Sequence, residues 1–140
     1  MEIKDIMSDN PNHLEPNLSI TEAAKKISTL GFDAYPIMEN GNIVGMITIQ
    51  DIVMRAVAKS MDMTNTKVRD VMTKQVFTCS ENDSLEEVAK VMAEHDVNGV
   101  PVMNNEKRLV GFVSLDDFIH KGKDEKIWHE LTRSLHRATI

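Results

Sequence analysis

Two short stretches of this sequence combine a hydroxyl side chain with a carboxylate at a spacing that suits ligand binding. They are Gly45-Met-Ile-Thr-Ile-Gln-Asp51 and Gly111-Phe-Val-Ser-Leu-Asp-Asp117. In each, an apolar run typical of a strand ends at Thr48 or Ser114, and a helix is expected to begin there, three residues before the acid. Such a corner offers free backbone N–H groups, a hydroxyl and a carboxylate, which together can hold a phosphorylated sugar. The same spacing is that of a helix capping box, in which the acid bonds only to its own helix.

Composition and charge limit the classes of protein to be considered. With 140 residues, 41% of them hydrophobic, the chain can form one ordinary domain or two small ones that share a core. Its net charge is −6 and it has no basic run, so no direct nucleic-acid partner is expected. No apolar run approaches the length of a membrane span and the N-terminus lacks an apolar signal core, which predicts a cytoplasmic protein with no membrane partner. Cys79 is the single cysteine, so an internal disulfide is excluded.

The sequence repeats itself along most of its length. A shift of 65 positions aligns three pairs of segments: residues 3–7 with 68–72, 19–22 with 84–87, and 35–38 with 100–103. After one additional residue near Arg108 the shift becomes 66, and Asp51 then aligns with Asp117. The alignment continues to Lys121, which indicates a duplicated structural element.

Each copy is predicted to contain a helix, two strands and a second helix after a short extended lead-in. The first helices begin with capping boxes, Ser19 with Glu22 and Ser84 with Glu87, and Gly31 ends the earlier one. The remaining predictions are strands at 34–38, 42–48, 99–103 and 108–114, and second helices at 49–59 and 115–121. The apolar residues of the helix at 49–59 recur at helical spacing and are expected to form one apolar face: Ile49, Ile52, Val53, Ala56 and Val57.

The predicted fold class is α+β, with two β-α-β-β-α repeats packed sheet to sheet so that each covers the apolar face of the other. Residues 1–60 are expected to form the first domain, 61–67 a polar linker and 68–122 the second domain. Residues 123–140 read as one more helix, with Trp128, Leu131 and Leu135 on one face. That face could pack on the same chain or on a second subunit, and the sequence leaves both alternatives open.

The ordered set of motifs resembles the cystathionine β-synthase (CBS) domain. The set is Asp-Ile/Val-Met, Ser-x-x-Glu opening a helix, x-Pro-Val/Ile-Met, and Val-Gly-Φ-Φ-Ser/Thr-x-x-Asp, and it occurs twice within about residues 1–121. Two such domains in tandem are similar to the pair often called a Bateman module. The resemblance implies a pseudo-twofold axis and two clefts, each able to take an adenosine-containing ligand such as AMP, ADP, ATP or S-adenosylmethionine. It further implies that Asp51 and Asp117 accept hydrogen bonds from ribose hydroxyls.

The two implied clefts differ in composition. The resemblance assigns these residues to the first cleft: Thr48, Gln50, Asp51, Arg55, Phe77, Thr78, Asn98, Gly99 and Val100. It assigns these to the second: His13, Phe32, Asp33, Ala34, Phe112, Ser114, Asp116 and Asp117. Because Asp33 and Asp116 add negative charge to the second cleft, a phosphorylated ligand is expected in the first, and an uncharged group or a sulfonium in the second. Gln50 and Asp116 stand where many family members carry arginine, which argues against tight ATP binding.

The favoured hypothesis is a regulatory module that senses an adenine nucleotide or adenosyl compound, forms a homodimer, and acts on a partner protein in trans. The alternative is a structural dimerisation scaffold whose clefts are vestigial. The sequence offers no Ser-His-Asp, Cys-His or Walker-type arrangement, so it is not expected to be an enzyme. Its five histidines lack zinc-ligand spacing, so neither a metal nor a required cofactor is predicted.

Overall fold

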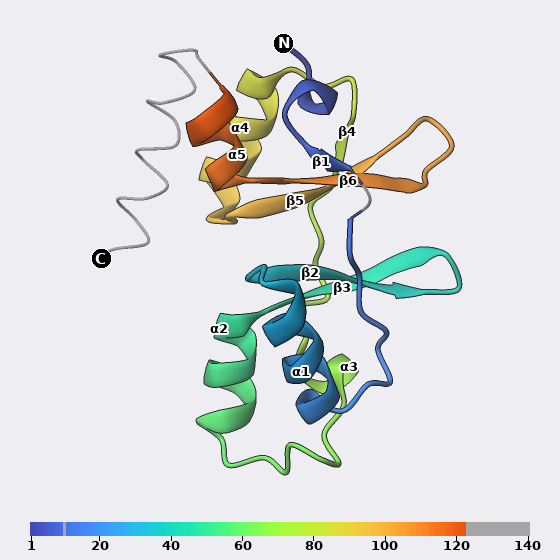
Figure 1. Ribbon diagram of the computed structural model, residues 1–140, viewed down its shortest axis with the longest axis vertical. Coiled ribbons are helices and arrows are strands. Elements are labelled where there is room, and N and C mark those ends of the chain that lie inside the picture. Colours follow the sequence, from blue (N-terminus) through green and yellow to red (C-terminus); the bar gives the residue numbers. More distant parts are fainter. Residues whose placement is uncertain (10, 123–140) are drawn as a thin grey trace. The chain divides into compact units, whose positions relative to one another are not determined.

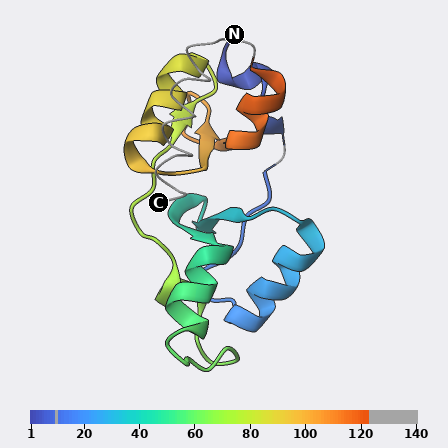
Figure 2. The same ribbon diagram turned by 90° about the vertical axis from the view of Figure 1, so that its left-hand side faces the viewer.

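The computed structural model describes residues 1–9 and 11–122, which form two compact units (Figure 1). Unit 1 consists of Met1–Pro11 together with the chain from Phe77 onward, and unit 2 consists of Asn12–Val76. The helix predicted at 123–140 lies outside the described residues. Each unit is an antiparallel hairpin with helices against it, as the views in Figures 1 and 2 show.

Unit 2 is built around the hairpin of β2 (Ala34–Glu39) and β3 (Asn42–Thr48). The turn between them is Asn40-Gly41, whose φ angles of 54° and 81° are the left-handed values that a tight two-residue hairpin requires. Isolated bridges from Leu14 to Ile37 and from Thr73 to Met46 extend the hairpin on both sides. The helices of this unit are α1 (Ile20–Leu30), α2 (Ile49–Asp51), the π-helix η2 (Ile52–Val57) and α3 (Val68–Val71).

Unit 1 has the same arrangement, but short strands stand where unit 2 has isolated bridges beside its hairpin. Its sheet has the order β1-β6-β5-β4, in which only the β4–β5 pair is parallel. The strands are β1 (Ser8–Asp9), β4 (Cys79–Ser80), β5 (Gly99–Met103) and β6 (Leu109–Ser114). The helices are the 3₁₀ turn η1 (Ile3–Asp5), α4 (Leu85–His95) and α5 (Leu115–Lys121). The predicted succession of helix, two strands and helix is therefore confirmed in both copies, whereas the lead-ins, predicted to be extended, contain the helical turns η1 and α3.

The lead-in segments of the two repeats are exchanged between the units. Ile3 and Ile6, from the first repeat, are 0% and 1% exposed in the core of unit 1. Val68 and Val71, from the second repeat, are 0% and 1% exposed in the core of unit 2. The boundaries expected at 1–60 and 68–122 thus follow the sequence repeat, whereas the compact units divide the chain at 11/12 and 76/77.

Two glycines let the exchanged lead-ins approach the hairpins. A Cβ on Gly45 would lie 2.5 Å from Met72 Sδ and 2.9 Å from the Thr73 carbonyl oxygen, which is closer than atoms can pack. At Gly111 the corresponding neighbours are Met7 Sδ and the Ser8 carbonyl oxygen, the latter at 2.9 Å. The glycine of each Val-Gly-Φ-Φ motif is therefore required by the packing of a lead-in from the other repeat.

The first helices of the two copies differ in how they are capped. The box predicted for α1 is confirmed, because Ser19 Oγ accepts from the Glu22 N–H at 3.1 Å and Glu22 Oε1 accepts from the Ser19 N–H at 3.3 Å. Gly31, at φ 85°, ends this helix as predicted. In α4, Ser84 Oγ accepts from the Glu87 N–H at 3.2 Å, but the reciprocal bond is not among those of the described residues.

The helix predicted at 49–59 is confirmed as helical over residues 49–57, but its form differs from an ordinary α-helix. After the three residues of α2, the chain continues as a π-helix, with the Ala58 N–H donating to the Val53 carbonyl at 2.8 Å. Bonds from i to i+5 are those of a π-helix, a rare form that the spacing of apolar residues does not predict. Ala56 is fully buried, whereas Ile49, Val53 and Val57 are 42%, 48% and 57% exposed.

Candidate functional site: the two helix-start carboxylates

The helix that follows β3 begins with a reciprocal pair of hydrogen bonds. Thr48 Oγ1 accepts from the Asp51 N–H at 3.0 Å, and Asp51 Oδ2 accepts from the Thr48 N–H at 3.0 Å. The Asp51 side chain is 14% exposed, and its other oxygen, Oδ1, lies 3.8 Å from Arg55 Nε. Arg55 also donates from a terminal nitrogen to the Val71 carbonyl at 3.1 Å.

The helix that follows β6 repeats this geometry. Asp117 Oδ2 accepts from the Ser114 N–H at 2.9 Å and from the Ser114 hydroxyl at 3.1 Å, while Ser114 Oγ accepts from the Asp117 N–H at 3.2 Å. The Asp117 side chain is likewise 14% exposed, and its Oδ1 lies 3.6 Å from Lys121 Nζ. Lys121 Nζ also donates to the Ile6 carbonyl at 3.3 Å.

Both carboxylates therefore cap their helices, as the spacing predicted, and their role as ligand acceptors stays a prediction. Capping occupies only Oδ2. Among the described residues, the ion-pair partner of Oδ1 is Arg55 for Asp51 and Lys121 for Asp117. The distances, 3.8 Å and 3.6 Å, are longer than a hydrogen bond. An ionised carboxylate has lone pairs on both oxygens, so Oδ1 can still accept a bond from a ligand hydroxyl.

The loop before each hairpin is bonded to the helix start of its own unit. The Asp33 carbonyl accepts from the Ile49 N–H at 3.0 Å, and the Asn98 carbonyl accepts from the Leu115 N–H at 2.8 Å. Sequence reasoning placed Asp33 with Ser114, and Asn98 with Thr48, across the two units. In the structure each of these loops is hydrogen-bonded to the helix start of its own unit. That Asp33 and Asn98 also face the helix start of the other unit stays a prediction.

The aromatic residues assigned to the clefts make contacts inside their own units. The ring of Phe112 lies over Gly99, where an added Cβ would be 2.5 Å from the ring. The ring of Phe77 stacks on His95, with centroids 3.8 Å apart and planes 16° apart. Phe32 is half exposed, and its N–H donates to the hydroxyl of Tyr35 at 2.9 Å. Burial raises the pKa of Tyr35, so this hydroxyl stays neutral at physiological pH.

The charges expected to distinguish the clefts are more exposed than the two capping acids. The Asp116 side chain is 81% exposed and lies 3.3 Å from His120 Nδ1, so solvent screens its charge. Asp33 is also exposed. The other predicted site residues divide by burial: His13, Gln50, Thr78 and Asn98 are exposed, Ala34 is half-buried and Val100 is buried.

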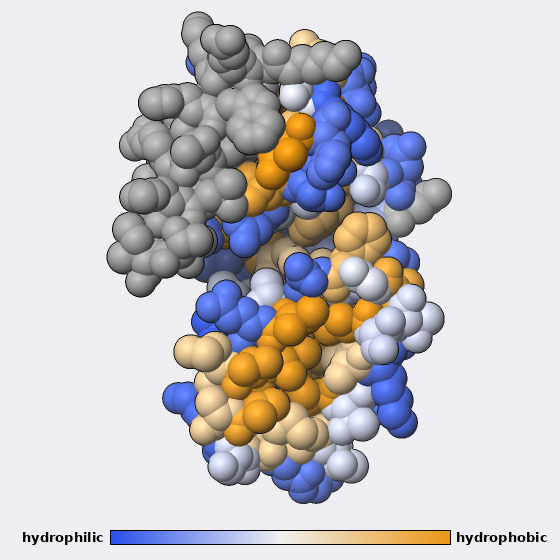
Figure 3. All heavy atoms as spheres, turned by 60° about the vertical axis from the view of Figure 1, so that its left-hand side comes forward, coloured by the Kyte–Doolittle hydropathy of each residue, from blue (hydrophilic) through white to orange (hydrophobic). Residues whose placement is uncertain are grey.

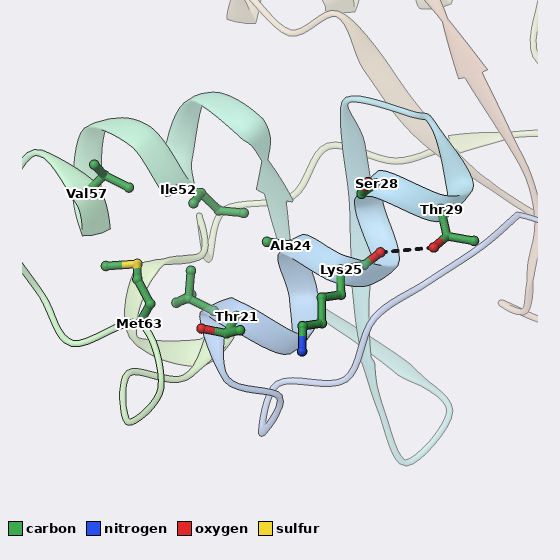
Figure 4. Close-up of a pocket in the computed structure, with 9 residues that line it drawn as sticks. Thr21, Ala24, Lys25, Ser28, Thr29, Ile52, Val57 and Met63 are labelled. Atoms are coloured by element: carbon green, nitrogen blue, oxygen red, sulfur yellow. Dashed lines mark hydrogen bonds between the residues drawn. The ribbon is translucent and has the colours of Figure 1, made fainter.

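An apolar groove in unit 2 was not foreseen from the sequence. It encloses about 640 Å³ between α1 and η2, and Figure 4 shows side chains from both helices around it. Its lining residues are Ile20, Thr21, Ala24, Lys25, Ser28, Thr29, Ile52, Val57 and Met63. Beside it, Ile49, Val53, Met54 and Val57 form a surface that we name the α2–η2 face, and Figure 3 shows hydrophobic side chains gathered there. The signal in the sequence was the apolar spacing at 49–59, which predicts an apolar face but not whether it is covered.

The described residues contain no group of three or more histidine, cysteine or acidic side chains placed to hold a metal ion. In the same part of the chain, no helix has the length and apolar character needed to cross a membrane.

The thiol of Cys79 is half-buried, and burial raises its pKa to about 12, so it is a poor nucleophile.

Comparisons with known proteins agree with the duplicated plan. The sequence profile of the CBS domain matches residues 3–58 and again residues 68–124. The CBS domain-containing protein YhcV of Bacillus subtilis is 32% identical over 136 residues, which are 96% of each chain. The L-aspartate semialdehyde sulfurtransferase of Methanocaldococcus jannaschii is 35% identical over 82% of this chain, which spans only 22% of that enzyme.

A solved structure connects this fold with adenosine compounds. The CBS domain pair of protein MJ0100, in complex with 5′-methylthioadenosine and S-adenosyl-L-methionine, superimposes with a TM-score of 0.77. It is 33% identical and is matched over 85% of this chain and 93% of that one. The duplicated fold, with a Ser/Thr-x-x-Asp helix start in each copy, is that of a tandem CBS-domain protein. The chain belongs to the CBS-domain family.

Proposed function

We propose that this protein is a regulatory module that binds an adenosine-containing ligand and acts on a partner protein in trans, without catalysing a reaction. Asp51 and Asp117 are the proposed ribose acceptors, each through Oδ1. The observation that carries the proposal is the complex of the related MJ0100 pair with two adenosyl compounds, combined with the repeated half-buried carboxylate in this chain. A ligand of this class would regulate a partner only through its different affinity for two arrangements of the protein.

The ligand that we propose for the Asp51 site is a phosphorylated one, because Arg55 supplies a cation beside the carboxylate. For the Asp117 site we propose an uncharged or sulfonium-containing adenosyl compound, since Asp116 adds a second acid next to the capping one. The screening of Asp116 by solvent and by His120 reduces this preference to a modest one.

The test is a calorimetric titration with AMP, ADP, ATP, 5′-methylthioadenosine and S-adenosylmethionine. Asp51→Asn and Asp117→Asn keep an oxygen that can cap the helix and remove the charge, so each is expected to weaken its own ligand by about 1–3 kcal/mol, or at least about fivefold. Asp70→Asn is the matched control, because Asp70 Oδ2 caps the Lys67 N–H at 3.0 Å in α3 and has no proposed ligand. If the wild-type protein binds none of the five compounds at millimolar concentration, the sensing proposal is wrong.

A second candidate function is dimerisation as a scaffold, and the α2–η2 face favours it. Four large apolar side chains there are 42–58% exposed next to an open groove, a pattern typical of protein interaction sites. We propose a second copy of the chain as the partner. Val53→Glu should then convert a dimer to a monomer in size-exclusion chromatography with light scattering, whereas Asn42→Glu at an exposed turn should not. An unchanged mass for Val53→Glu would exclude this face as the interface.

A further inference from the structure

A basic side chain joins each capping acid to a backbone carbonyl of the exchanged lead-in. In unit 2 it is Arg55, between Asp51 and the Val71 carbonyl, and in unit 1 it is Lys121, between Asp117 and the Ile6 carbonyl. The two bases occupy equivalent positions of the repeat, and so do the two carbonyls. The same bridge is thus made twice, by different side chains, which indicates that the bridge matters more than the residue type.

The bonded carbonyls lie just before the two points at which the chain passes from one unit to the other. Ile6 precedes the passage at 11/12, and Val71 precedes the passage at 76/77, in each case by five residues. Both residues are 1% exposed. The next residues, Met7 and Met72, lie against the motif glycines, so the lead-in is fixed on one side by packing and on the other by the base.

The bridge leaves room for a competitor at the acid. Arg55 and Lys121 approach Oδ1 at 3.8 Å and 3.6 Å, whereas their carbonyl bonds measure 3.1 Å and 3.3 Å. The contact with the acid is therefore an ion pair without a hydrogen bond. A hydroxyl that donates to Oδ1 would weaken the pull of the carboxylate on the base, and the base would then bond more fully to the lead-in carbonyl.

We propose that Arg55 and Lys121 are positioning residues that transmit occupancy of each carboxylate to the segment joining the two units. This inference rests on the proposed ligand sites. A ligand at Asp51 tightens the hold of Arg55 on Val71, and a ligand at Asp117 tightens the hold of Lys121 on Ile6. Arg55 contacts the acid and the carbonyl through different nitrogens, whereas Lys121 uses Nζ for both, so the exchange is more complete at Lys121.

Amide hydrogen exchange of the lead-in measures this coupling. The Thr73 N–H donates to the Met46 carbonyl at 2.8 Å, and the Met72 N–H to the Val68 carbonyl at 2.9 Å, so both report on how firmly residues 71–73 are held. In the ligand-free protein, Arg55→Gln should speed exchange at these two amides by about three- to tenfold, the loss of one charge-assisted bond. Arg55→Lys should restore slow exchange, because lysine makes the equivalent bridge in unit 1. Lys59→Gln, two residues beyond η2, should change nothing.

The coupling itself is tested with AMP and S-adenosylmethionine as probes. In the wild-type protein, a bound probe should slow exchange at Met72 and Thr73, or at Met7, whose N–H donates to the Ile3 carbonyl at 3.0 Å. Arg55→Gln is expected to weaken AMP, because Arg55 is the cation proposed beside its phosphate, so both variants are compared at probe concentrations that saturate them. At saturation the probe should no longer slow exchange in the lead-in of that unit in Arg55→Gln or Lys121→Gln.

Two results overturn the inference. One is unchanged exchange in ligand-free Arg55→Gln, and the other is protection of the lead-in by the probe in both glutamine variants. If neither probe binds the wild-type protein, the proposed ligand sites fail and the coupling fails with them. The ligand-free arm then still decides whether the base holds the lead-in.

Discussion

Ile52 in unit 2 and Phe118 in unit 1 occupy equivalent positions, directly after the capping acid, yet Ile52 is partly buried and Phe118 is 1% exposed. Both acids before them accept from the backbone N–H three residues earlier, at 3.0 Å for Asp51 and 2.9 Å for Asp117, and both side chains are 14% exposed. Beyond the first turn, unit 1 continues as the α-helix α5 and unit 2 as the π-helix η2. The two copies therefore share the capped helix start but differ in the helix that follows it. The proposed ligand site lies in the shared part, and the proposed interaction face lies in the part that differs.

The largest expected difference between the units comes from their helix cores. Phe118→Ala should destabilise unit 1 by about 3–5 kcal/mol, because it leaves a cavity around a fully buried ring. Ile52→Ala removes fewer atoms from a partly exposed site and should cost about 1–2 kcal/mol. Urea unfolding of both variants measures the two losses. Equal losses would contradict the difference in burial.

Substitution of the motif glycine should destabilise the two units by similar amounts, because each glycine packs against a lead-in in the same way. Gly45→Ala and Gly111→Ala each force a Cβ against a methionine sulfur and a backbone oxygen, and each should cost about 1–3 kcal/mol. Met72→Ala should rescue Gly45→Ala only in part, because the Thr73 carbonyl oxygen stays 2.9 Å from the new Cβ. A double-mutant cycle followed by thermal unfolding measures this coupling. Full additivity would show that the lead-in moves away freely.

The capping hydroxyls should give a smaller effect. Thr48→Ala and Ser114→Ala remove the acceptor for the N–H of Asp51 or Asp117 and should each cost about 1 kcal/mol. Ser114→Ala should cost slightly more, since that hydroxyl also donates to Asp117 Oδ2 at 3.1 Å. Chemical denaturation at neutral pH measures both, and a much larger loss for Thr48→Ala would break the equivalence of the two helix starts.

A further expected difference is a dependence on pH that comes from the single thiol of the chain, which lies in unit 1. Cys79 aligns with Leu14 in the repeat, and burial raises the pKa of its thiol from 9.0 to about 12. Above pH 9 the unfolded chain loses this proton and the folded one keeps it. Cys79 therefore stabilises the fold fully below pH 9, and that contribution declines as pH rises toward 12. Thermal unfolding of wild type and Cys79→Leu between pH 8 and pH 10.5 should show a steeper decline in wild type.

Much of the local structure could be predicted because it depends on neighbours in sequence. Asn40-Gly41 forms a tight turn, Gly31 ends α1, and α5 has the predicted bounds, since backbone conformation and capping act over a few residues. The two acids were also identifiable, from their spacing to Thr48 and Ser114. That the base four residues after each acid, Arg55 or Lys121, also donates to a backbone carbonyl was not predicted, because the carbonyl belongs to the exchanged lead-in.

By itself, the sequence determined that the chain is duplicated, where α1, α2, α4 and α5 start, and that Asp51 and Asp117 stand at the starts of α2 and α5. Only the tertiary structure decided which lead-in packs on which hairpin, because residues 3–7 and 68–72 carry the same local pattern and either could fill either site. It also decided that Val53, Met54 and Val57 of η2 are exposed, since hydrophobic spacing predicts a face and not what covers it.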